Sequence, residues 1–433
     1  MARPVQAVNP GPPTDTPPAA ARLAPGSGGH GGEFESASLE VRIERTGAEL
    51  LSCLSAALDA VPAPTRRPQA LAAKLGIDKV LASRVLKAVR AADPISAVHR
   101  MPGPDPLRRV LGALEASGAP AHTIEPARRA VERFDALIRR DLGDRSSLDA
   151  VLSAWVPEAR REFELRRKQA AFRALSQLKG AEARSILATV MLHPSDDGTH
   201  LDVVWINGLV GVQRLRPGAS VKITTRRMSR DRGDRAPRTL DGAPVADLPS
   251  LMLREFCSDP LPRLRVQQAG ESVHYALDSE GFGPASASDI VFAEANMREI
   301  KRFRSADSNR KGYVFAETSV PAAVLQFDAL LHDDAFPGAT PQLRLIDTAF
   351  EGVADVNDPA REIDTLDMLE SVEPMGRGLA RARSADVPRY TDMLARVCGA
   401  MNWDPRAFRG HRVRIDYPVY GSQVAMLFDL PPV

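Results

Sequence analysis

A cluster of basic and hydroxyl side chains lies between residues 61 and 100. This segment holds eight basic residues and two acidic ones, a local charge of +6 in a chain whose formal charge is +2. Three of the eight lysines fall within it, so the arginine-rich composition of the chain (49 Arg) does not explain it. Cationic side chains neutralise phosphates, and guanidinium and hydroxyl groups hydrogen-bond to base edges. The cluster therefore predicts contact with a phosphate backbone.

The apolar residues between these charges predict two short helices, at about 68–75 and 79–91, joined by a sharp turn. The residues expected on their inner faces are Leu71, Ala72, Leu75, Ala82, Val85 and Val89. Gly76 follows the first helix, where a sharp turn needs a backbone conformation that side chains resist. Ile77 then returns to the core, and Asp78 is a good N-cap for the second helix.

This pattern resembles the helix-turn-helix of bacterial transcription regulators, over about 30 of the 433 residues. Ala72 matches the small residue of the family's first helix, Gly76 the turn glycine, and Ser83 and Arg84 an outward hydroxyl and arginine. The resemblance implies sequence-specific binding of double-stranded DNA by a homodimer, with the second helix in the major groove. The residues expected to contact DNA are Arg66, Arg67, Lys79, Val80, Ser83, Arg84 and Lys87.

Two features of this region leave other interpretations open. Val80 and Leu81 fall in the first turn of the second helix, which we expect to be exposed and where polar residues are more usual. They could contact thymine methyl groups, or they could make this a trihelical module that docks on another protein. The segment 95–104 (ISAVHRMPGP) is expected to be a short extended piece, a possible wing strand, closed by Pro102 and Pro104.

The remaining chain predicts an α+β multidomain protein. The expected organisation is a disordered tail at 1–37, a helix-turn-helix domain at 38–104, a helical linker or dimerisation segment at 105–180, and a sheet-rich α+β region at 181–433 that senses a ligand or partner. The expected strands are 187–193, 201–206, 220–226, 263–268, 272–277, 289–295, 312–320, 342–348, 412–417 and 423–428, with a helix near 388–401.

Four other segments carry residue types that could form sites. His193, Asp196, Asp197 and His200 could bind a transition metal, although DDG favours a plain hairpin turn. Segment 347–373 has nine acidic residues and one basic one, a charge of −8. It could be a solvated face, a hard-cation loop around DVNDP, or a mask for the basic N-terminal half. Segment 221–240 could be a charged loop or a second phosphate contact, and 374–381 an ordinary or anion-binding turn.

Composition limits the remaining function classes. Hydrophobic residues are 44% and charged residues 26%, an ordinary globular balance. The chain shows neither a signal peptide nor an apolar run long enough to span a bilayer, and Cys53, Cys257 and Cys398 are widely spaced. We therefore expect a cytoplasmic, non-membrane protein that needs no metal or cofactor. Since no residue set specifies an enzyme, an unrecognised enzyme in the C-terminal region remains only an alternative.

Overall fold

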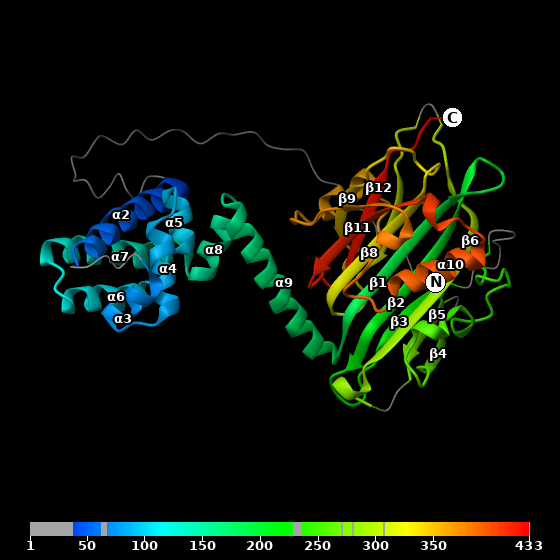
Figure 1. Ribbon diagram of the computed structural model, residues 1–433, viewed down its shortest axis with the longest axis horizontal. Helices are drawn as coiled ribbons and strands as arrows, with labels where there is room; N and C mark the ends of the chain where they lie inside the picture. Colours follow the sequence, from blue (N-terminus) through cyan, green and yellow to red (C-terminus); the bar gives the residue numbers. More distant parts are fainter. Residues whose placement is uncertain are drawn as a thin grey trace, which may run out of the picture. The chain divides into compact units, whose positions relative to one another are not determined.

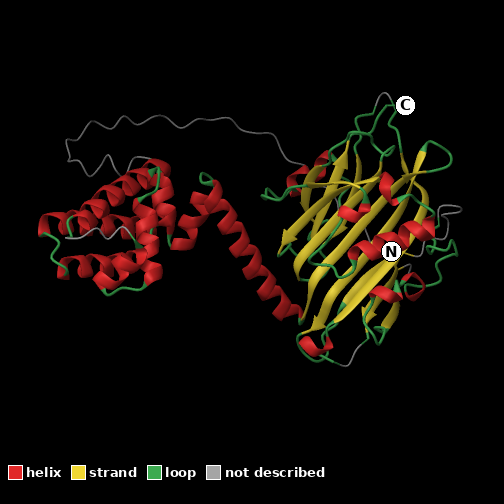
Figure 2. Ribbon diagram, viewed as in Figure 1, coloured by secondary structure: helices red, strands yellow, loops and turns green. Residues whose placement is uncertain are grey.

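The computed structural model describes residues 38–61, 67–227, 236–269, 272–278, 281–305 and 308–432, so the expected tail at 1–37 lies outside the described residues. The chain divides into two compact units, 1–152 and 153–433. The first is helical and the second rich in strands, and the predicted α+β fold class is confirmed (Figure 2). The division falls inside the segment 105–180 that the sequence suggested as a linker.

The N-terminal unit is a set of helices packed around α2 (Leu39–Asp59). The others are α3 (Pro68–Leu75), α4 (Lys79–Val89), α5 (Pro94–Arg100), α6 (Pro104–Ala116), α7 (Ala121–Ala136), a π-helical segment (Leu137–Leu142) and α8 (Arg145–Ser153). Ile43, Leu50 and Leu54 of α2 are fully buried, at the three- and four-residue spacing of one helix face. Helix α2 contacts α4, α5, α6 and α7, and α4 in turn packs against α3.

The expectation of an extended piece at 95–104 is wrong, because residues 94–100 form helix α5. Asp93 caps this helix by accepting a hydrogen bond from the backbone N–H of Ser96 at 2.8 Å, and Pro94 occupies the first turn, where its missing N–H costs nothing. A Cβ at Gly47 of α2 would lie 2.3 Å from the carbonyl oxygen of Pro94, so this glycine lets α5 approach α2 closely. The described part of this unit has no wing strand.

The C-terminal unit contains one large and two small sheets. Helix α9 (Pro157–Lys179) ends at Gly180, which adopts the left-handed conformation (φ 70°), and the chain passes directly into β1. The strands are β1 (Ala181–Pro194), β2 (His200–Arg214), β3 (Lys222–Arg227), β4 (Leu264–Ala269), β5 (Ser272–Leu277), β6 (Ser288–Lys301), β7 (Gly312–Glu317), β8 (Ala322–His332), β9 (Gln342–Asp347), β10 (Glu373–Arg377), β11 (Phe408–Asp416) and β12 (Ser422–Phe428). All the strands expected from the sequence are present, most of them with shifted ends.

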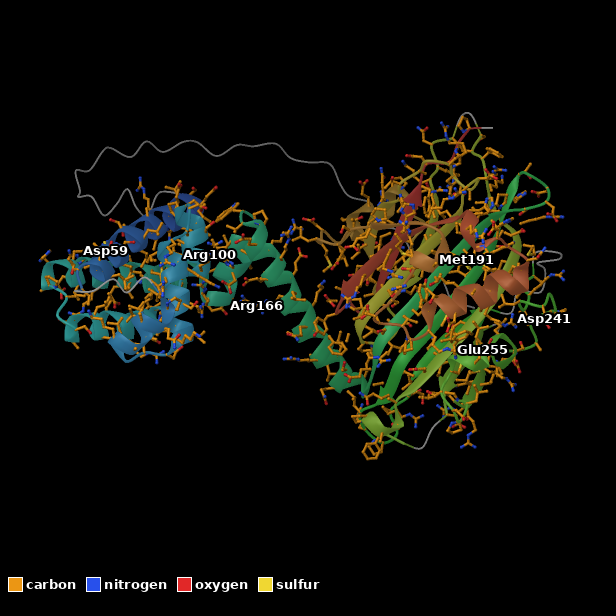
Figure 3. The ribbon with its side chains drawn as sticks, viewed as in Figure 1. Asp59, Arg100, Arg166, Met191, Asp241 and Glu255 are labelled. Atoms are coloured by element: carbon orange, nitrogen blue, oxygen red, sulfur yellow. The ribbon has the colours of Figure 1, made fainter. Side chains whose placement is uncertain are left out.

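The large sheet separates two hydrophobic cores. Its order is β10-β11-β8-β1-β2-β6, and β1 and β8 pair in parallel whereas its other pairs are antiparallel. Helix α10 (Tyr390–Met401) lies across one face (Figure 1), where Met191, labelled in Figure 3, is fully buried. The sheets β7-β12-β9 and β3-β5-β4 pack against the other face. The unit is therefore layered as helix, sheet, and a pair of smaller sheets.

Candidate nucleic-acid interface

The predicted turn between α3 and α4 is present. Gly76 has φ 63° and ψ 29°, the left-handed conformation that glycine adopts without strain. The N–H of Ile77 donates to the carbonyl of Ala72 at 3.2 Å, and the Asp78 carboxylate accepts from the N–H of Leu81 at 2.7 Å. Helix α3 thus ends at Leu75 and α4 begins at Lys79, so residues 68–89 are two helices, not one rod.

The inner face of α4 is shifted slightly from the expected one. Ala82 and Val85 are fully buried as predicted, but Ala88 is buried in place of the half-buried Val89. Leu81 is only 7% exposed, so the prediction that it lies in an exposed turn is wrong. Because Leu81 precedes Val85 by four residues, it shares the face that packs toward α2, α3 and α5.

The outer face of α4 carries the predicted contact residues. Lys79, Arg84 and Lys87 are exposed, Ser83 is partly exposed, and Val80 retains 69% of its surface. Lys79, Ser83 and Lys87 follow at intervals of four, so they form one stripe about 12 Å long at 1.5 Å per residue. Arg67, just before α3, is also exposed, whereas Arg66 lies outside the described residues.

Within the described ranges, no carboxylate neutralises this stripe. Both acidic residues of segment 61–100, Asp78 and Asp93, cap helices, and neither forms an ion pair with Lys79 or Lys87. Arg108 on α6 shows the opposite situation, since it hydrogen-bonds to Asp105, Glu132 and Asp135. Together with the neighbouring exposed Arg67 and Arg84, the stripe carries positive charge that no carboxylate of the described chain compensates.

The three comparisons with known proteins gave the same result. No family model, curated protein or solved structure matches the chain. No helix among the described residues is long and apolar enough to cross a membrane. The functional argument therefore depends on the geometry and chemistry of the side chains.

Residues 193–202 form a hairpin connection, as the sequence DDG favoured over a metal site. Strands β1 and β2 pair up to Pro194 and Leu201, and Asp197 accepts hydrogen bonds from the N–H groups of Thr199 and His200. Although burial acts to raise the pKa of Asp197, these hydrogen bonds and the His200 ring hold it well below its usual range. His193 instead stacks on Trp403, with ring centroids 4.8 Å apart. In the described parts of the chain, no three His, Cys, Asp or Glu residues are grouped to hold a metal ion.

Ion pairs within the C-terminal unit neutralise part of the acidic segment 347–373. Asp367 pairs with Arg160 of α9 at 2.7 Å, and Glu370 pairs with Lys168 of the same helix. In the DVNDP loop, Asp355 pairs with Arg310 at 2.7 Å and Asp358 caps a short 3-10 helix. These carboxylates fasten their loops to neighbouring elements, which leaves fewer of them to mask a basic surface.

The other expected sites are less informative. The basic segment 221–240 is described only in part, because residues 228–235 lie outside the described ranges. Burial raises the pKa of the Cys257 thiol, whose sulfur accepts a hydrogen bond from the N–H of Val291, so this thiol is poorly suited to act as a nucleophile. Arg377, within the expected turn at 374–381, pairs with Asp333.

A buried charged network that the sequence did not predict lies between the large sheet and α10. Asp328 of β8 is completely buried and accepts two hydrogen bonds from Arg412 of β11, at 2.8 and 2.6 Å, and one from the hydroxyl of Tyr390 at 2.6 Å. Thr189 of β1 hydrogen-bonds to the same hydroxyl at 2.8 Å. Burial and the adjacent Asp328 raise the pKa of Tyr390 well above its usual value, so the phenol keeps its proton. A charged residue inside the apolar run VLQFDALL is the signal that could have revealed it.

Proposed function

We propose that this protein binds double-stranded DNA through α4 and acts as a transcriptional regulator. The observation that carries the proposal is the exposed stripe of cations without carboxylate partners, on the second helix of a helix-turn-helix whose turn glycine and N-cap are both present. Cations that no internal carboxylate neutralises are available to bind phosphates.

The geometry of α4 suggests a division of roles. A recognition helix presents the residues of its first turns to base edges and its flanks to the backbone. Ser83 and Arg84 are placed to hydrogen-bond with bases, arginine to guanine being the commonest such contact. Arg67, Lys79 and Lys87 would then contact phosphates, and Val80 the methyl group of a thymine. One such helix covers a half-site, which favours a homodimer on a two-fold site.

A protein-docking role for the same helices is the second candidate. Val80 motivates it, because this apolar side chain on the outer face of α4 has 69% of its surface exposed. Salt separates the two roles. Release of counterions from DNA makes binding fall steeply with salt, whereas docking on an apolar patch depends weakly on it.

The test is fluorescence anisotropy with a mixed-sequence DNA duplex between 50 and 200 mM salt. If Arg67, Lys79 and Lys87 each contact a phosphate, the slope of log K against log salt is about −2.7, which is a loss of about 40-fold over this range for one protomer. The double variant Arg84→Ala, Lys87→Ala retains two of these cations, so we expect a slope of about −1.8.

The matched control removes two exposed arginines of the same unit, Arg129→Ala and Arg140→Ala, which lie on α7 and the π-helical segment. It changes the net charge equally and should leave the slope unchanged. Equal losses in both double variants, or a wild-type affinity independent of salt, would reject the DNA proposal. Genome-wide crosslinking of the tagged protein would then show whether binding is sequence-specific.

A further inference from the structure

A cleft of about 280 Å³ opens between the two small sheets, on the face of the large sheet opposite α10. Strands β3 and β7, each at the edge of its own small sheet, form its walls, and β1, β2 and β6 form its floor. A volume of this size admits a small organic molecule.

Aromatic and polar side chains alternate on the floor of this cleft. Trp205 of β2 and Phe292 of β6 both line it and are partly buried against the adjacent core. The strand register places Trp205 opposite Glu294 and Asn207 opposite Phe292. Each ring therefore has a polar cross-strand neighbour within reach of the same ligand.

The charge of the lining is negative. Glu294 of β6 and Glu317 of β7 line the cleft, and no described side chain of the lining is a Lys, Arg or His. Glu317 makes no hydrogen bond or ion pair with any described residue. Burial raises the pKa of Glu317, and Lys222 at the start of β3 acts to lower it. A carboxylate beside an aromatic floor, without a bonded partner in the described chain, suits a cationic ligand.

We propose that this cleft binds a small alkylated ammonium compound. The faces of Trp and Phe attract an ammonium group through the ring quadrupole, and Trp does so most strongly. The carboxylate of Glu317 supplies the opposite charge, and Asn207 can hydrogen-bond to a polar group of the ligand. The cleft belongs entirely to the C-terminal unit, so this proposal can be tested independently of the DNA proposal.

The experiment is isothermal titration of the full chain with choline and with its uncharged carbon isostere, 3,3-dimethylbutan-1-ol. The two probes have nearly the same shape, so only the charge distinguishes them. We expect choline to bind at least about tenfold more tightly, as cation–π attraction in a partly desolvated site requires. Trp205→Leu and Glu317→Gln should each weaken choline binding by about fivefold or more.

Two control variants match these changes outside the cleft. Phe350→Leu removes an aromatic ring that is 98% exposed, and Glu299→Gln neutralises an exposed carboxylate of β6 beyond the cleft. Both should bind choline as the wild type does, and thermal unfolding checks that every variant is folded. The proposal is overturned if choline binds no better than its isostere, or if folded Trp205→Leu and Glu317→Gln proteins bind it normally.

Discussion

Removal of Asp328 tests whether the buried network holds α10 on the sheet. The carboxylate has no exposed surface, and the Arg412 side chain is 15% exposed. Asp328→Ala leaves this guanidinium buried with the carbonyl of Arg383 as its remaining hydrogen-bond partner among the described residues, and leaves the Tyr390 hydroxyl with Thr189 alone. Breaking a buried pair from one side costs about 3–5 kcal/mol, which is a large fraction of the stability of a typical domain.

Urea unfolding followed by tryptophan fluorescence measures this cost selectively. All three tryptophans, Trp155, Trp205 and Trp403, belong to the C-terminal unit, so their emission reports its unfolding. Tyr390→Phe removes one hydrogen bond to a charged acceptor and should cost about 1.5–3 kcal/mol. Asp416→Ala, which breaks an exposed pair with Arg414 on the same strand β11, should cost at most about 1 kcal/mol.

A double variant distinguishes the cost of leaving one buried charge without its partner from the cost of lost packing. Asp328→Leu with Arg412→Leu removes both charges, and apolar replacement of a buried pair is often neutral for stability. We expect this protein to be more stable than Asp328→Ala. The reasoning is refuted if Asp328→Ala costs no more than the exposed Asp416→Ala, or if the double variant is the less stable of the two.

Two further changes have defined outcomes. Gly76→Val should destabilise the N-terminal unit by about 1–2 kcal/mol, because the left-handed backbone conformation at this position is strained for a residue with a side chain. Steric contact does not contribute, since no atom lies within 4 Å of a Cβ placed there. Gly76→Asn should cost less, and thermal melts followed by circular dichroism measure both variants. Burial and Arg409 lower the pKa of His411, whose ring nitrogens have no hydrogen-bond partner in the described structure. As pH falls below about 6.5, His411 is protonated in the unfolded chain but stays neutral in the folded chain. The free energy of unfolding should therefore fall with pH, and it should fall less steeply in His411→Phe.

Local signals predicted the helix-turn-helix because each acts within a few residues. Gly76 ends α3, Asp78 caps α4, and the three- and four-residue spacing fixes the buried face. The extended piece expected at 95–104 was wrong because the prediction relied on Pro102 and Pro104, which follow helix α5. The signals that start this helix are Asp93 and Pro94. The shift from Val89 to Ala88 reflects packing against α2 and α5, which residue spacing alone does not contain.

Strand β8 was missed although it lies at the centre of the large sheet. Both its faces are covered, so Ala322–His332 is an almost continuous apolar run that lacks the alternation of a half-exposed strand. Its parallel pairing with β1 joins segments about 140 residues apart, and no local pattern records such a pairing. The network around Asp328 and the cleft beside Trp205 both depend on this sheet order, so neither could be predicted before it was known.

The pairing of the arginines explains why charge counts along this chain are ambiguous. With 49 arginines and 55 acidic residues, basic clusters arise often, and most mean little by themselves. Arg108 and Arg412 each bind carboxylates, so their charge is used within the protein. Arg84 and Lys87 have no such partner in the described chain. A cation without an internal carboxylate partner is more available to an external anion, and the structure adds this observation to the basic cluster that the sequence already singled out at α4.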